Sequence, residues 1–135
     1  MTEDTQEELV RYVPGICKGE KPEYEGYVEF KAMGFDERWA LVEKYVDLLP
    51  LVMKLRESEG TALEIGMAAV QDRKILKLGG EAIRDAGVFV RSVDIKRLKD
   101  GKHFTTFEAL GRAPTLYMTL FEIAFAVIKG ADEGN

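Results

Sequence analysis

Cys17 and His103 are the only cysteine and the only histidine among 135 residues, and such a pair could act as a nucleophile and its general base. Cys17 lies in a predicted loop, however, without the sharp strand-to-helix turn that exposes a catalytic nucleophile. One cysteine cannot form an intramolecular disulfide, and with one histidine it supplies too few ligands for a zinc site. We therefore predict that neither residue is catalytic, that the chain is no enzyme, and that it binds no metal or cofactor.

Two further patterns are typical of ligand sites but do not complete a motif. Gly79-Gly80 precedes a short predicted helix, but it lacks the further glycine, lysine and serine or threonine spacing of phosphate-binding loops. We expect this glycine pair to end a helix. Four acids within residues 20–29 do not follow the fixed spacing of a calcium loop, and we expect them to be solvated; they are Glu20, Glu23, Glu25 and Glu29.

The formal net charge of −5 argues against generic nucleic-acid binding, because that function requires a positive surface. The segment 91–112 is an exception, since its six basic side chains outnumber three acidic ones. Only Phe89 and Phe104 could stack on bases there, so nucleic acid is the weaker interpretation. We expect this basic surface to bind an acidic segment of another protein or of a second copy, through Arg91, Lys96, Arg97, Lys99 and Lys102.

The stretch 113–128 is almost wholly apolar, and Glu122 is its only charged residue. It is shorter than the about 20 residues of a bilayer span, so it indicates a buried helix and no membrane partner. Such a helix is either the central core helix or meets another protein on one side. Because an unpaired buried carboxylate is costly, we expect Glu122 to mark a partner-binding side with Met118 and Phe125. The core side should consist of Leu116, Leu120, Ile123 and Val127.

The elements that must position these residues follow from periodicity. Apolar and polar residues alternate over 27–33, which predicts a half-buried strand. The segment 88–106 is rich in β-formers around Asp100-Gly101, which favours a hairpin with a type I′ turn; a helix over 88–98 is the alternative.

Apolar spacings of three and four residues predict helices over 36–59, with a kink or a restart at Pro50, over 62–78 and over 113–129. The apolar stripe of the first helix comprises Trp39, Val42, Tyr45, Val46 and Leu49. A short helix is expected over 107–111. The predicted fold class is α+β: a small antiparallel sheet, one strand plus a hairpin, packed by three to four helices.

The chain is long enough for one domain, which we place at residues 27–130. Residues 1–26 are acidic and contain Pro14, Gly15, Gly19 and Pro22, which predicts a flexible arm, with a short helix over 6–13. We expect the arm to be ordered by another chain or not at all. Residues 131–135 should be a frayed tail. The start is acidic and polar, without the pattern of a secretory signal, which predicts a cytoplasmic protein.

Two stretches resemble the small tail-assembly proteins of tailed bacteriophages. One is GYVEFKAMGFDER over 26–38, and the other is VDIKRLKDGKHFTTFEAL over 93–110. The resemblance implies a non-enzymatic protein that binds other tail components, often the tape-measure protein, during assembly in the host cytoplasm or within the virion. It carries no catalytic residue.

The predicted function is therefore protein–protein interaction with self-association, as a tail-assembly chaperone or minor virion structural component. A small cellular adaptor or regulatory subunit is the alternative. An enzyme that uses carboxylates in a pocket is a third interpretation.

Overall fold

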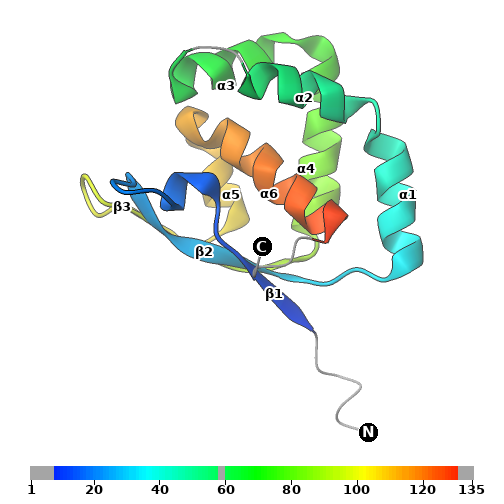
Figure 1. Ribbon diagram of the computed structural model, residues 1–135, viewed down its shortest axis with the longest axis horizontal. Coiled ribbons are helices and arrows are strands. Elements are labelled where there is room, and N and C mark those ends of the chain that lie inside the picture. Colours follow the sequence, from blue (N-terminus) through cyan, green and yellow to red (C-terminus); the bar gives the residue numbers. More distant parts are fainter. Residues whose placement is uncertain (1–7, 58–59, 131–135) are drawn as a thin grey trace, which may run out of the picture.

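The computed structural model describes residues 8–57 and 60–130 and has the predicted α+β architecture (Figure 1). Four antiparallel strands form one sheet in the order β1-β2-β3-β4. Their bounds are Leu9–Tyr12, Tyr24–Lys31, Val90–Arg97 and His103–Phe104. β2 confirms the strand expected over 27–33, and β3 with β4 confirms the hairpin and excludes the helix over 88–98. The tail expected over 131–135 and the first seven residues lie outside the described residues.

β1 corrects the short helix that we expected over 6–13. It pairs with β2, with Val10 opposite Phe30, and Arg11 Nη2 lies 3.1 Å from a Glu29 carboxylate oxygen. The run from Leu9 to Tyr12 alternates exposed and half-buried side chains of good strand-forming types, so it can add to the open edge of β2. This part of the segment expected to be a flexible arm therefore belongs to the sheet.

The hairpin turn differs from the expected type I′ geometry. Gly101 has a φ of 76°, but no described residue other than glycine has a positive φ, so Asp100 does not adopt the first left-handed position. The Asp100 carboxylate accepts a hydrogen bond from the Lys102 amide at 3.0 Å, which stabilises a longer loop between Arg97 and Lys102. Glycine is still required at position 101, because other residues disfavour a positive φ.

The first predicted helix is divided into α1, Phe35–Tyr45, and α2, Leu48–Arg56. The break lies before Pro50 and not at it. Pro50 is the third residue of α2, where the missing amide hydrogen costs no helical bond, so the proline sits just inside a new helix.

α3, Ala62–Gln71, begins at a capping box, in which Thr61 and Glu64 each accept a hydrogen bond from the other's amide. A π-helical turn, η3, Ile75–Gly79, then runs directly into α4, Gly80–Gly87. Gly79-Gly80 therefore lies inside a continuous helical segment. Our expectation that this glycine pair ends a helix was wrong. Gly79 serves close packing instead, since a Cβ there would lie 2.3 Å from the Phe121 ring.

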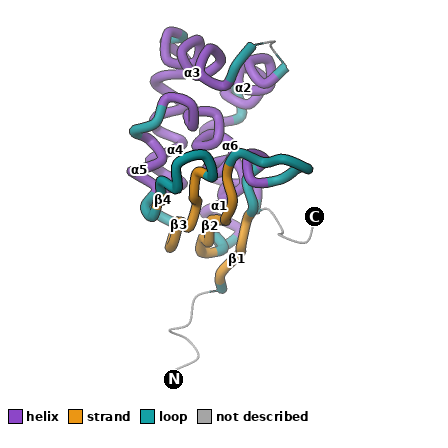
Figure 2. Tube along the Cα trace, turned by 90° about the vertical axis from the view of Figure 1, so that its left-hand side faces the viewer, coloured by secondary structure: helices purple, strands orange, loops and turns teal. Residues whose placement is uncertain are grey.

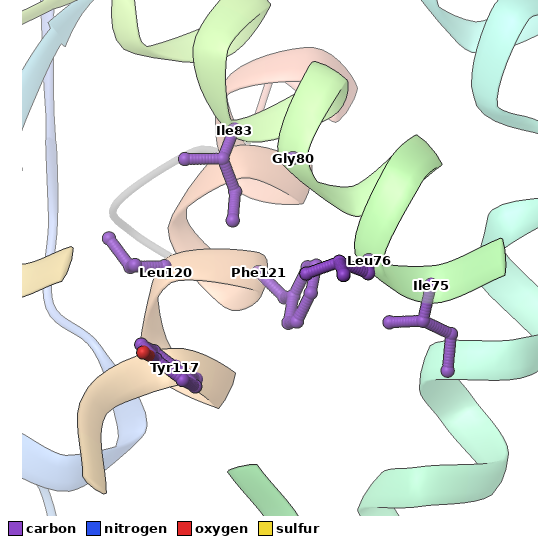
Figure 3. A pocket seen from close by; sticks show the side chains of 7 residues that line it. All are labelled: Ile75, Leu76, Gly80, Ile83, Tyr117, Leu120 and Phe121. Atoms are coloured by element: carbon purple, nitrogen blue, oxygen red, sulfur yellow. The ribbon is translucent and has the colours of Figure 1, made fainter. Parts of the chain in front are cut away.

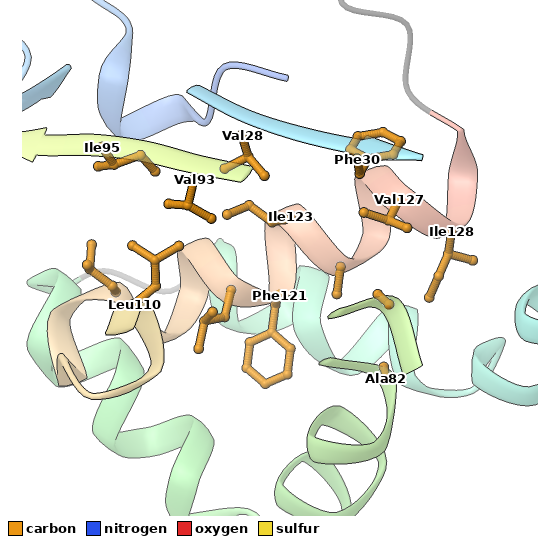
Figure 4. Close-up of a cluster of buried hydrophobic side chains, with 14 of the residues drawn as sticks. Val28, Phe30, Ala82, Val93, Ile95, Leu110, Phe121, Ile123, Val127 and Ile128 are labelled. Carbon is orange, nitrogen blue, oxygen red and sulfur yellow. The ribbon is translucent and has the colours of Figure 1, made fainter. Parts of the chain in front are cut away.

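The last segment forms α5, Phe107–Gly111, a 3-10 turn, η4, Pro114–Leu116, and α6, Tyr117–Lys129, which ends at Gly130 in the left-handed conformation. α6 is central: the sheet lies on one side of it, and α2 and α3 lie at the far end of the molecule (Figure 2). Val28, Val93 and Ile95 of the sheet lie beside Ile123 of α6 in the core (Figure 4). The expected core side of α6 is confirmed, because Leu116, Leu120, Ile123 and Val127 are all buried.

Candidate protein-interaction surface

The basic residues expected to bind a partner are largely engaged with neighbours in the chain. Lys96 Nζ lies 3.7 Å from Glu25, and Arg97 Nη2 lies 3.0 Å from Asp100. Arg91 donates to the Val88 carbonyl at 2.7 Å. The Arg97 guanidinium, followed by the Lys102 amide, lowers the pKa of Asp100 to about 2. The hairpin thus alternates in charge and is no continuous positive surface.

Lys99 and Lys102 remain exposed at the hairpin tip. The Lys102 ammonium lies 5.4 Å from the centre of the Phe104 ring, which belongs to the core. These two side chains are open to an acidic segment. They do not lie together with the partner-binding residues that we predicted on α6.

Glu122 is hydrogen-bonded within its own chain and not to another protein. Its carboxylate accepts hydrogen bonds from the Tyr12 hydroxyl at 2.5 Å and from the Gly15 amide at 2.9 Å. These bonds tie the end of β1 and the following turn, η2, Gly15–Cys17, to α6. Glu122 therefore holds the N-terminal segment on the core.

Met118 and Phe125 are half-buried and pack against the core. Of the two, Phe125 reaches the wall of an open apolar groove between α6 and α1. The groove has a volume of about 280 Å³ and is lined by Val42, Tyr45, Val46, Phe125, Ile128 and Lys129. The groove thus places Phe125, one of the predicted partner-binding residues, beside a second apolar surface.

That surface is the apolar stripe of α1, and most of it faces solvent. Phe35 is 76% exposed, Trp39 55%, Val42 37% and Val46 58%. The Phe35 and Trp39 rings are stacked, with centroids 6.3 Å apart and planes 11° apart. The stripe predicted for this helix places Trp39, Val42 and Val46 together with Tyr45, and of these four residues only Tyr45 is buried. We call Phe35, Trp39, Val42 and Val46 the α1 face.

A polar cluster at the C-terminal end of α1 fixes the rotation of this helix about its own axis. Tyr45 donates its hydroxyl to the Asp85 carboxylate of α4, and Lys44 Nζ lies 3.1 Å from the same oxygen. Burial, with the bond to Asp85, raises the pKa of Tyr45. Burial also opposes ionisation of Asp85, but the bonds from Tyr45 and Lys44 outweigh it and keep its pKa below the usual value. These contacts hold Tyr45 inward and thereby turn the α1 face outward.

Arg38 connects the other half of α1 to the end of α6 by close packing. Its guanidinium lies against Gly130 at the C-terminal end of α6, so close that a Cβ on Gly130 would lie 2.4 Å from Arg38 Nη2. A cation is favourable there because the helix end carries partial negative charge. With α1 held by Arg38 and Tyr45, exposure of the α1 face follows from the packing of the whole fold.

A second apolar cavity lies between η3, α4 and α6 (Figure 3). Its volume is about 180 Å³, and its walls include Ile83, Leu120 and Phe121. Leu76 is 54% exposed and stands at this cavity, so side chains of α6 are reachable here as well.

The remaining candidate residues show no catalytic arrangement in the part of the chain that is described. Burial, followed by the charges of Glu122 and Glu25, raises the pKa of Cys17 to about 11, so its thiol is protonated at neutral pH and is a poor nucleophile. His103 Nε2 lies 2.6 Å from Asp94, which engages the imidazole. Over residues 8–57 and 60–130, no group of three or more histidine, cysteine and acidic side chains could hold a metal ion.

Comparisons with known proteins give no further guide to the site: no family model matches the chain, and neither the curated proteins nor the solved structures give a match. Within the described ranges, no helix is both long and apolar enough to span a bilayer.

Proposed function

We propose that this chain is a non-enzymatic interaction protein that docks a partner on the α1 face. The observation that carries the proposal is the exposure of Trp39, stacked on Phe35 and in line with Val42 and Val46. Large apolar side chains gathered in one exposed patch mark interaction sites on soluble proteins, whereas single exposed ones do not. Tryptophan is also the residue type most enriched among those that dominate binding energy.

The specific role that we propose is a tail-assembly chaperone or minor virion component, with the tape-measure protein or another tail protein as the partner. Support comes from the resemblance of residues 26–38 and 93–110 to tail-assembly proteins. The second of these stretches builds the hairpin and α5, and the first builds β2 and the start of α1, including the exposed Phe35. The protein would act in the host cytoplasm or remain in the virion.

Co-expression tests this proposal. Where tail-tube and tape-measure genes neighbour the gene for this chain, the tape-measure protein is co-expressed with it, and complexes are separated by size-exclusion chromatography. We expect a complex that Trp39→Ala weakens at least tenfold, the loss typical of a dominant contact. Leu98→Ala, which truncates an exposed apolar residue on the hairpin, is the matched control and should leave the complex intact.

A complex that Trp39→Ala leaves unchanged would contradict the α1 face as the docking site. Absence of any complex with tail proteins would contradict the assembly role. A gene neighbourhood without tail genes would favour the cellular adaptor instead.

A further inference from the structure

A row of acidic side chains borders the α1 face. Asp36 and Glu43 lie seven residues apart, which is about two helical turns, so they project from the same side of α1. Val46 keeps helical dihedral angles, with φ −60° and ψ −33°, so Asp47 continues this row one turn further. All three are exposed. We call Asp36, Glu43 and Asp47 the acidic ridge.

Apart from the favourable position of Asp36 in the first turn of α1, the acidic ridge has no structural task that the described residues reveal. Over residues 8–57 and 60–130, no hydrogen bond or ion pair involves the side chains of Asp36, Glu43 or Asp47. The neighbouring charges of α1 differ, because Glu37 accepts from the Gly34 amide and Lys44 contacts Asp85. Three uncompensated carboxylates beside an exposed apolar stripe repel one another and are available to a partner.

The ridge and the groove lie on opposite sides of the α1 face. At about 100° per residue, Glu43 lies on one side of the stripe, while Arg38 and Tyr45 lie on the other, toward α6. The groove with Phe125 and Lys129 adjoins that second side. A segment that lies along α1 therefore meets an apolar floor, carboxylates on one border and Lys129 on the other.

This charge pattern selects the partner. We infer that the α1 face binds an amphipathic helix of another protein, with an apolar stripe and a row of lysine or arginine side chains beside it. A helix suits the site because the exposed residues follow spacings of four, three and four, as in paired helices. The inference rests on the proposed function and names the chemistry of its partner.

A second copy of this chain fits the same face poorly. Symmetric pairing of two α1 helices in antiparallel orientation would place the two acidic ridges next to each other, and like charges at such positions are destabilising. The basic residues of the hairpin lie on strands and a loop and do not form an apolar helical stripe. We therefore take the partner to be a different protein, and a dimer of this chain that covers the α1 face would contradict this choice.

Two synthetic peptides test the inference on the full chain. Both have about 18 residues, enough to form a helix on binding, and share one leucine stripe at heptad spacing. One carries lysines beside the stripe and the other glutamates, and neither contains tryptophan. Trp39 is the only tryptophan of the chain, so its fluorescence reports binding. We expect the lysine peptide to bind at least about tenfold more tightly, with a preference that weakens at high salt.

Charge reversal at the ridge supplies the control. Glu43→Lys should remove most of the preference for the lysine peptide, whereas Glu20→Lys, an exposed residue in the loop before β2, changes the net charge equally and should leave the preference within about twofold. Circular dichroism verifies that both variants are folded.

Each other outcome overturns the inference. Equal binding of both peptides, or equal effects of Glu43→Lys and Glu20→Lys, would show that the ridge does not select the partner, while the α1 face would remain the docking site. Binding of neither peptide, or a dimer in sedimentation that shields Trp39, would show that a basic helix is not the occupant. Co-expression with the tape-measure protein decides the proposed function separately.

Discussion

α6 is apolar on almost all sides and α1 carries an apolar stripe among charged residues, and the fold uses their apolar side chains in opposite ways. Eight residues of α6 are buried between the sheet and the other helices, whereas α1 buries only Tyr45 and exposes Phe35, Trp39 and Val46. The difference arises from their neighbours. α6 is covered on several sides, and α1 stands at the edge, where Arg38 and Tyr45 determine which side turns inward. Apolar periodicity thus predicts a stripe, but the packing of the whole fold determines whether the chain or a partner covers it.

The largest contrast should appear when one side chain is truncated in each helix. Leu120→Ala in α6 should lower the free energy of unfolding by about 2–5 kcal/mol, because it leaves a cavity in the core. Trp39→Ala in α1 should change it by about 0.5 kcal/mol or less, because the ring is mostly solvated. Urea denaturation followed by circular dichroism compares them. Equal losses would mean that α1 is part of the core.

Gly79 and Gly80 test how closely η3 approaches α6. Gly79→Ala should destabilise the protein by about 1–3 kcal/mol, because its Cβ would overlap the buried Phe121 ring. Gly80→Ala should be neutral or stabilise by up to about 1 kcal/mol, since it has helical dihedral angles and open space around it. Thermal melts of the two variants should shift in opposite directions. A shift of the same sign in both would contradict the close approach of η3 and α6.

Tyr12→Phe tests whether the N-terminal segment is held on α6. Removing the hydroxyl deprives the half-buried Glu122 carboxylate of one donor and should cost about 1–2 kcal/mol. The segment 14–26 should then be cleaved faster in limited proteolysis, because β1 is an edge strand with one neighbour. If the variant and the parent were cut equally fast, the bond to Glu122 would not hold this segment.

Cys17 gives a pH-dependent measure of the same contact. Because its pKa is raised to about 11 in the folded chain, its thiolate forms at a higher pH than in the unfolded chain. Its contribution to stability is therefore fully present below the ordinary thiol pKa and is lost as the pH rises toward 11. Alkylation by iodoacetamide at pH 8.5 should be slower for the folded than for the urea-unfolded chain. Equal rates would show that the thiol is not buried beside Glu122.

Much of the fold was predictable because local signals decided it. The alternation in β2, the Thr61–Glu64 box and Gly130 at the end of α6 each depend on a few neighbouring residues. β1 was missed because a strand at a sheet edge depends on a distant partner, β2. The role of Gly79 was missed for a similar reason, since it is determined by Phe121, far along the chain.

The candidate site was less predictable than the fold. Phe125 lines an open groove, and its role in partner binding stays a prediction, whereas Glu122 binds Tyr12 and Gly15 of its own chain. The exposure of the α1 face was not predicted, because a helix with apolar residues on two sides gives no local sign of which side is covered. The available signal was that α1 has apolar residues on two sides. Leu41 and Tyr45 lie on the covered side, and Phe35 and Trp39 lie on the exposed one.

The most direct test of the central claim is the ¹⁹F spectrum of the chain labelled with 5-fluorotryptophan. Trp39 is the only tryptophan, so a single resonance reports on the α1 face even in a large complex. We predict a solvent-sensitive resonance in the free chain that shifts and loses its solvent sensitivity when the co-expressed tail protein binds. A complex in which this resonance stays unshifted and equally sensitive to solvent would contradict docking on α1.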